Sequence, residues 1–257
     1  MTRALREWMF RTWYWFVNNI DKNAEVLFMN YGYSSPDLKV TLGPADEPNR
    51  YSVQLYHLLG SAVDLRNRAI AEIGCGRGGG LSYVARTFSP ATALGVDLDK
   101  NAVGFCVKHY TTAGLSFAQG DAQNLPFLND NSFDAILNVE SSHRYPRMDL
   151  FLKEVCRLLR PGGYFLYTDF RYDHEIAGLR QRLVDSGMSV LKEVMITDNV
   201  VEALAADDPR RRMLIDKLAP RFIRKVALNF AGTVGSATYT QFATHKYEYY
   251  FYLMQKK

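Results

Sequence analysis

The sequence predicts an α/β protein built on a doubly wound, mainly parallel sheet, and three observations point to this fold class. The apolar run at residues 70–73 ends in a glycine-rich turn, after which apolar residues recur at helical spacing over residues 81–88. A second apolar run, TALGVDL at residues 92–98, ends beside a carboxylate. Strand-like and helix-like patterns then alternate as far as residue 170, as expected for parallel strands joined by helices.

The other elements follow from the same patterns. Before the first strand, residues 1–20 and 49–59 have helical spacing, with the aromatic segment VLFMNYGY at 26–33 between them. The rest of the core alternates helix and strand, with expected elements at residues 101–110, 117–118, 135–139, 147–159 and 164–169. Beyond residue 172 the pattern is mostly helical, and the run DDPRRR at 207–212 predicts a solvated helix face. Two strands are expected near the end, over about 236–242 and 246–254.

The composition limits the classes of protein to which this chain can belong. The chain has 257 residues, with 31 Lys and Arg against 27 Asp and Glu, so its net charge of +4 is small and does not indicate nucleic-acid binding. Its three cysteines, Cys75, Cys106 and Cys156, are odd in number and show no metal-ligand spacing. They fit reduced, buried residues, so we expect a cytoplasmic protein without a bound metal.

The N-terminal region is rich in aromatic and basic residues. Trp8, Trp13 and Trp15 lie among arginines, whereas no apolar run reaches the roughly 18 residues needed to span a bilayer. Arg11 interrupts the apolar region, which argues against a signal peptide. A helix here either packs over a substrate pocket as a lid or lies on a membrane surface. We adopt the lid and leave the peripheral membrane contact open.

The glycine-rich turn, residues 74–80, is the first candidate binding element. Glycines let the backbone turn sharply and let a ligand approach closely, and free amides at the following helix start favour an electron-rich group. Gly74, Gly76 and Gly79 also satisfy the G-x-G-x-x-G pattern of dinucleotide-binding proteins. By itself, the turn is therefore compatible with a nicotinamide or flavin cofactor, and also with no ligand.

Polar residues gather at one edge of the predicted sheet. Ligands of such sheets bind outside the carboxyl ends of the strands, and a carboxylate ending the second strand can accept both ribose hydroxyls of a nucleoside. The residues at or just after those ends are Glu72, Asp97, Asp121, Asn138, His143 and Asp169.

Five segments in order, EIGCGRGGG, GVDL, GDAQNLPF, FDAILNVESSH and LLRPGGYFLYTDF, resemble the class I S-adenosylmethionine-dependent methyltransferases over about residues 65–170. With FMNYGY and the ESSH-type loop, the sequence is most similar to mycobacterial and actinobacterial O-methyltransferases of phenolic glycolipids, glycopeptidolipids and sugar-bearing natural products. The resemblance implies a seven-stranded Rossmann-like methyltransferase fold. It also implies an N-terminal helical preface and a helical insertion before the last two strands, which would form a closing antiparallel hairpin.

The resemblance implies S-adenosylmethionine as cofactor and assigns its methionine part to the glycine turn. Glu72 would anchor the turn, while Gly74, Cys75 and Gly76 admit the methionine part. Tyr31 is a candidate for the cofactor's carboxylate end or for substrate, and equally a packing residue.

The nucleoside part is assigned in the same way. Asp97 would take the ribose hydroxyls and Leu98 would cover one adenine face. Asp121 would accept from the adenine amino group, beside the Ala122 amide, and Asn138 would offer its backbone to the amino end of the sulfonium.

For the reaction, the protein aligns an acceptor with the S–CH3 bond for SN2 transfer, and a base near an acceptor hydroxyl assists. His143 is the candidate base because an unperturbed imidazole titrates near neutrality. The resemblance implies that Asp169 orients His143. The alternative is C-methylation of a prenyl or sterol alkene through a carbocation stabilised by Glu140, and a further one is a non-catalytic cofactor-binding scaffold.

The expected acceptor is a large hydroxylated molecule such as a glycolipid, glycoside or other secondary metabolite. After the fourth strand the chain has Asn138, Val139 and Glu140 instead of an Asn/Asp-Pro-Pro-Tyr motif, which argues against methylation of nucleic-acid bases. Whether the chain forms a homodimer is left open.

The predicted organisation has four parts. These are a lid or preface at 1–64, the cofactor-binding core at 65–171, a helical substrate-side insertion at 172–228, and closing antiparallel strands of the core sheet at 229–257.

Overall fold

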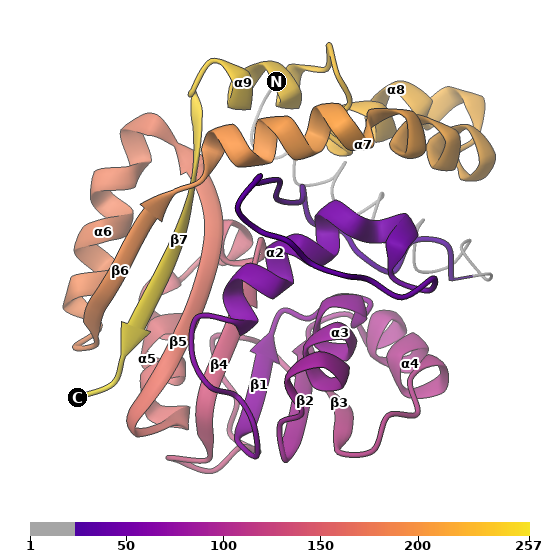
Figure 1. Cartoon of the computed structure of the whole chain (residues 1–257). Coiled ribbons are helices and arrows are strands. Elements are labelled where there is room, and N and C mark those ends of the chain that lie inside the picture. The colour runs from indigo at the N-terminus through magenta and orange to yellow at the C-terminus, as the bar shows by residue number, and fades with distance from the viewer. Residues whose placement is uncertain (1–23) are drawn as a thin grey trace.

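The computed structural model describes residues 24–257; residues 1–23, with the three tryptophans and the whole predicted helix 1–20, lie outside the described residues. Figure 1 shows a central sheet with helices on both sides. Within the described residues the sheet has seven strands in the order β3-β2-β1-β4-β5-β7-β6. Their bounds are β1 Ala69–Ile73, β2 Thr92–Asp97, β3 Leu115–Gln119, β4 Phe133–Val139, β5 Leu159–Tyr172, β6 Ser189–Met195 and β7 Tyr247–Gln255.

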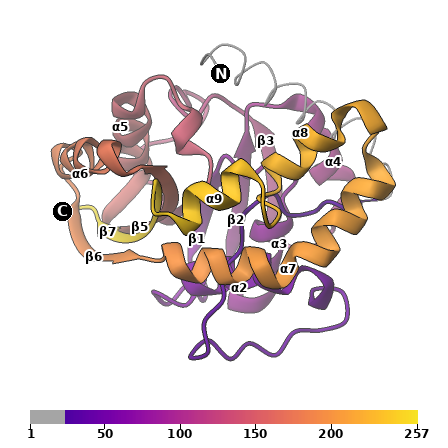
Figure 2. The same ribbon diagram turned by 90° about the horizontal axis from the view of Figure 1, so that it is seen from above.

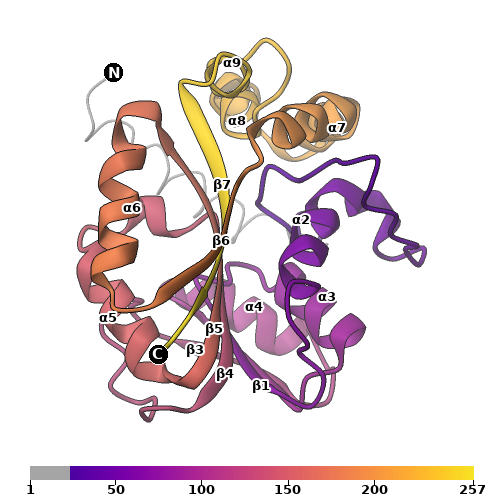
Figure 3. The ribbon, with the colours of Figure 1, turned by 60° about the vertical axis from the view of Figure 1, so that its left-hand side comes forward.

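The sheet is parallel from β3 to β5, whereas β7 runs antiparallel to both of its neighbours. Figure 3 shows three layers. One face is covered by α2 (Arg50–Gly60), α3 (Gly79–Phe88) and α4 (Lys100–His109), and the other by α5 (Met148–Leu158) and α6 (Ile176–Asp185). The predicted doubly wound α/β fold is confirmed.

Apolar side chains are buried on both faces of the sheet. Leu55 and Leu81 pack against one face, while Phe151 and Val155 pack against the other. The central strands β1 and β4 read as nearly continuous apolar runs because each contacts both of these cores. The strand order reverses between β1 and β4, so their carboxyl ends form the switch point at which such sheets bind ligands.

Three further helices extend over the carboxyl ends of the strands, as Figure 2 shows from above. They are α7 (Thr197–Leu218), α8 (Arg224–Phe230) and α9 (Ala237–Ala243). None of the helices in the described part of the chain has both the length and the apolar character needed to cross a bilayer.

The C-terminal part corrects two predictions. The strand expected over 236–242 is wrong, because this stretch is α9, whose N-terminus is capped by the Ser236 side chain accepting from the Tyr239 amide. The strand expected over 246–254 is confirmed as β7, but its outer partner is β6, within the stretch predicted to be helical. Most residues of this edge strand are exposed, so its apolar pattern is weak. Because α7, α8 and α9 lie between β6 and β7, the two strands do not form a hairpin.

The charged run on α7 is also not the solvated face that its composition predicts. Asp207 and Arg211 are buried, with exposures of 6% and 9%, and the Arg211 Nε donates to Asp207 at 2.9 Å. Arg211 also donates to the carbonyls of Asn30, Tyr31 and Ala231, at 3.3, 3.0 and 2.9 Å. A guanidinium with five donors can satisfy several carbonyls at once, so it is buried where α7 meets the preface.

Candidate functional site

The glycine turn after β1 adopts a left-handed backbone that favours glycine. Gly74 and Gly76 have φ values of +81° and +53°. The Gly74 amide donates to the Val96 carbonyl at 2.7 Å, and a Cβ at Gly74 would lie 2.3 Å from the Ser141 Oγ. The turn is therefore packed against the loop after β4 and leaves no room there for a side chain.

Two buried acceptor atoms have no partner at the switch point. Tyr56 donates to the Glu72 Oε1 at 2.7 Å, but Oε2 has no hydrogen-bond partner among the described residues. Asn138 uses its Nδ2 to donate to the Ile73 carbonyl at 2.6 Å, which leaves its Oδ1 likewise without a partner in residues 24–257. Because buried acceptors are costly unless they are bonded, this pair fits a ligand rich in donors, such as an ammonium group.

Burial raises the pKa of Glu72 to about 8, although the Tyr56 hydroxyl works in the opposite direction. Burial likewise raises the pKa of Glu140 to about 8, against the hydrogen bonds from the Tyr31 amide and the Tyr249 hydroxyl. Both carboxyl groups are therefore mostly protonated at pH 7 in the free protein.

We expect the stability of the cofactor-free protein to fall as the pH rises from about 6.5 to about 8.5. Because Glu72 and Glu140 keep protons in the folded state that the unfolded chain has already lost, the unfolding free energy declines through this range. The titration of His143 raises the unfolding free energy with pH, because burial lowers its folded pKa. This opposite effect is confined to pH values below the ordinary histidine pKa of about 6.5. Thermal unfolding at several pH values measures the effect.

Glu72→Gln and Glu140→Gln should each flatten that dependence, whereas Glu202→Gln, at an exposed position on α7, should leave it unchanged. A melting temperature that rises over the same pH range would contradict the prediction.

Asp97, at the end of β2, supports the turn directly. Its Oδ2 accepts from the Gly76 amide at 2.8 Å and its Oδ1 from the Asp99 amide at 2.9 Å. Leu98 beside it is 69% exposed, so its side chain is accessible at this edge of the sheet.

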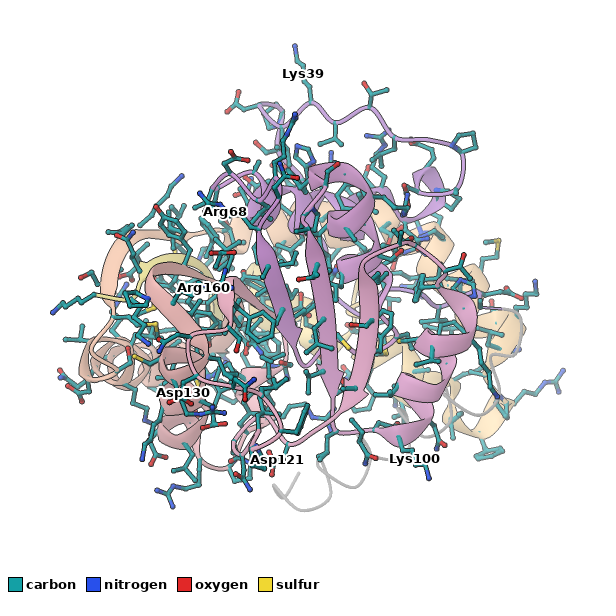
Figure 4. The ribbon with its side chains drawn as sticks, turned by 90° about the horizontal axis from the view of Figure 1, so that it is seen from below. Lys39, Arg68, Lys100, Asp121, Asp130 and Arg160 are labelled. Atoms are coloured by element: carbon teal, nitrogen blue, oxygen red, sulfur yellow. The ribbon has the colours of Figure 1, made fainter. Side chains whose placement is uncertain are left out.

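The loop after β3 holds the remaining predicted nucleoside residues. Asp121 is exposed and its Oδ1 accepts from the Gln123 amide at 2.9 Å, while Ala122 is buried. Figure 4 places Lys100 and Asp121 toward one end of the strands and Arg68 toward the other. Arg68 directly precedes β1, so Asp121 lies on the carboxyl side of the sheet, as predicted.

His143 and Asp169 form a hydrogen-bonded pair at the ends of β4 and β5. The His143 Nδ1 lies 2.8 Å from the Asp169 Oδ1, and the His143 amide donates to Oδ2 at 2.8 Å. Ser142 donates its hydroxyl to the same Oδ2 at 2.7 Å, and Arg171 lies 3.1 Å from it. The structure therefore brings together the predicted base and its predicted orienting acid.

The charge state of this group follows from its neighbours. Burial alone would raise the pKa of Asp169, but His143 and Arg171 hold it well below its usual range. Burial lowers the pKa of His143, with the Asp169 carboxylate opposing. The imidazole is thus predominantly neutral at pH 7 and, with Nδ1–H directed at Asp169, has Nε2 available as an acceptor.

A cavity of about 120 Å³ lies beside His143. Its walls come from the preface, the ends of β4 and β5, and the helices α7 and α8. Most of the lining is apolar or aromatic, and includes Val26, Phe28, Met29, Tyr31, Phe170, Leu214, Ile215, Phe230 and Ala231. The His143 side chain is 17% exposed and lies 4.6 Å from the Phe170 ring, measured between ring centroids.

Hydrogen bonds and ring contacts of Glu140 and Tyr31 connect the walls of this cavity. The Glu140 Oε1 accepts from the Tyr31 amide at 2.7 Å and from the Tyr249 hydroxyl at 2.8 Å. The Tyr31 ring packs edge-on against Phe170 and Phe242. In this structure, Tyr31 is a cavity wall and Glu140 links the preface to β7.

Some site residues were not anticipated from the sequence. Asn30 is 6% exposed and lines the cavity, and its Oδ1 has no partner in the described chain. Arg210 and Arg211 line the cavity from α7. Arg171 lies two residues after the predicted Asp169, so its position in the chain was a usable signal, whereas no pattern placed the α7 arginines at the cavity.

The chain is similar to known methyltransferases. A family model described as a methyltransferase domain matches residues 71–167. The chain is 47% identical over 204 residues to a fatty-acid O-methyltransferase of Mycolicibacterium smegmatis, covering 79% of this chain and 74% of the relative. It is 40% identical over 229 residues to a phthiotriol/phenolphthiotriol dimycocerosates methyltransferase of Mycobacterium tuberculosis, covering 89% and 84%.

Among solved structures, that of the cyclase SpnF superposes with a TM-score of 0.71 at 18% identity, covering 95% of this chain and 94% of that chain. At this identity the likeness shows the fold alone, because one fold supports different reactions.

Proposed function

The chain belongs to the S-adenosylmethionine-dependent methyltransferases, and from this premise we propose that it methylates an oxygen atom of a lipid-like acceptor held in the cavity beside His143. Its cofactor is S-adenosylmethionine, which supplies an activated methyl group. The observation that carries the proposal is the His143–Asp169 pair, joined at 2.8 Å, whose imidazole lines an apolar cavity.

The residues present fit this cofactor. The acceptor atoms of Glu72 and Asn138 without partners in residues 24–257 suit the cofactor's ammonium group. We assign Asp97 to the ribose hydroxyls, which two carboxylate oxygens can accept together.

The remaining assignments are to the adenine. Exposed Leu98 would cover one face of the base, and Asp121 with the Ala122 amide would bond its edge. Cys75 is buried in the turn between Gly74 and Gly76, and we assign no separate role to its side chain.

In the proposed reaction His143 accepts the proton of an acceptor hydroxyl at Nε2. The bound cofactor would supply the methyl group to the oxygen, and its sulfur would keep the electron pair of the broken S–CH3 bond. Asp169 stabilises the imidazolium that forms, because it stays ionised and accepts from Nδ1. Arg171 and Ser142 hold Asp169 in place at 3.1 and 2.7 Å.

The acceptor class follows from the cavity lining and from the names of the relatives. The apolar side chains of Phe28, Leu214 and Ile215 suit an alkyl chain. The two relatives are named for a fatty acid and for phthiotriol dimycocerosates, both lipids. A hydroxylated lipid is therefore the proposed acceptor.

A second candidate acceptor is the carboxyl group of a fatty acid. Arg210 and Arg211 line the cavity and share one counter-ion, Asp207, so the cluster carries a net positive charge that suits a carboxylate. Such an acceptor is already ionised at neutral pH and needs no base. Carbocation chemistry is less well supported, because a Glu140 with a pKa of about 8 is largely uncharged at pH 7.

Labelled S-adenosylmethionine with a matched long-chain alcohol and fatty acid tests the proposal. We expect transfer to the alcohol, giving a methyl ether that survives mild alkali, whereas a methyl ester would be cleaved. Transfer to the acid alone would favour the second candidate, and transfer to carbon would contradict O-methylation.

Three earlier expectations stay predictions: a lid formed by residues 1–64, a cytoplasmic location, and the absence of a nucleic-acid partner. A homodimer and a membrane contact through the N-terminal helix stay open. For the lid, residues 26–31 already form cavity walls, while the tryptophans lie outside the described residues.

A further inference from the structure

The turn that joins α7 to α8 is basic and carries an exposed aromatic ring. Residues 217–225 read KLAPRFIRK, with four basic residues and no acidic one. Phe222 is 86% exposed, and Met213, near the end of α7, is 60% exposed. Large apolar side chains flanked by basic residues are typical of surfaces that contact lipid headgroups.

The charges of this turn are only partly neutralised. Lys217 pairs with Glu25 at 2.9 Å and Arg224 with Asp216 at 3.1 Å. Arg221 and Lys225 are exposed and make no ion pair with another described residue. The turn therefore keeps a positive charge on both sides of Phe222.

The same turn connects two walls of the acceptor cavity. Leu214 and Ile215 line the cavity just before it, and Phe230 and Ala231 line it just after. Figure 2 shows α7 and α8 meeting at this end of the molecule. A surface that touched this turn would lie next to the place where the two walls join.

We propose that residues 213–225 dock on an anionic lipid surface and thereby bring the cavity to a membrane-resident acceptor. Phe222 and Met213 would enter the headgroup region, while Arg221 and Lys225 pair with lipid phosphates. This inference rests on the proposed lipid acceptor for its purpose, but the binding itself does not depend on catalysis.

Co-sedimentation of the full chain with vesicles tests the docking. Vesicles of phosphatidylcholine mixed with phosphatidylglycerol should bind the protein more tightly than phosphatidylcholine alone. The double variant Arg221→Ala, Lys225→Ala should weaken binding to the anionic vesicles by about thirtyfold, since each basic residue near such a surface contributes about a factor of five. Phe222→Ser should weaken binding to both kinds of vesicle.

A matched control is Arg182→Ala with Val184→Ser, two exposed positions on α6 at the side of the sheet away from the cavity. It should bind like the unmodified chain. Equal binding by the turn variants and the unmodified chain, or no vesicle binding by any of them, would overturn the proposal. Methyl transfer to an acceptor dispersed in detergent is measured in parallel, so loss of the activity and loss of docking are distinguished.

Discussion

Replacing His143 with alanine is expected to lower kcat on a hydroxylated acceptor by a factor of about 10²–10⁴, with little change in cofactor affinity. The imidazole lines the acceptor cavity and is oriented by Asp169 at 2.8 Å, so its loss removes the proton acceptor and leaves the glycine turn intact. Steady-state kinetics with labelled cofactor, together with calorimetric binding of S-adenosylhomocysteine, measure both quantities.

The pH dependence gives an independent readout of the same residue. Only the neutral imidazole accepts a proton, so kcat should rise with pH through the titration of His143. Burial lowers the pKa of His143, so in the free enzyme, which kcat/KM reports, the midpoint of the rise should lie below the ordinary value of about 6.5. Asp169→Asn should reduce kcat less than His143→Ala, because the base remains while its orientation and charge partner are disturbed.

Glu140→Gln is the matched comparison, because Glu140 also lines the cavity but is engaged by Tyr31 and Tyr249. In the hydroxyl mechanism this variant should be milder than His143→Ala, and in the carbocation alternative the order reverses. A His143→Ala enzyme with nearly full activity on an alcohol would exclude His143 as the base. Retained activity on a fatty acid alone would instead identify a carboxylate acceptor.

Replacing Asp97 with alanine is expected to weaken S-adenosylhomocysteine binding by at least about a hundredfold. Each charge-assisted hydrogen bond to a ribose hydroxyl contributes about 1.5–3 kcal/mol, and the variant removes two. Asp97 also accepts from the amides of Gly76 and Asp99, so the turn itself loses support. Calorimetry measures the affinity, and thermal unfolding without ligand separates lost contacts from lost folding.

Asp64→Ala is the control, since Asp64 is exposed in the loop before β1 and accepts only a local bond from the Arg66 amide among the interactions of the described chain. It should leave cofactor binding unchanged. An Asp97→Ala protein that binds like the unmodified chain would contradict the ribose assignment, and tight binding of NAD in place of S-adenosylhomocysteine would contradict the cofactor.

The sequence alone determined the core fold and placed the candidate cofactor residues at one edge of the sheet. Buried parallel strands are contiguous apolar runs, so β1, β2 and β4 were visible in the chain, and the glycine turn marked the first of them. Parallel strands joined by helices present their carboxyl ends at one edge. For that reason Asp97, Asp121 and His143 could be placed together without coordinates.

Only the tertiary structure decided how the cavity is closed. The strand β6 is a mostly exposed edge strand, so its local pattern did not distinguish it from helix, and the Tyr- and Thr-containing stretch of α9 is helical because it is capped and packed. The Arg211 contacts with Asn30 and Tyr31 join residues about 180 positions apart in the chain. Burial of that arginine depends on carbonyl acceptors that folding brings to it, and no local pattern in a sequence encodes such partners.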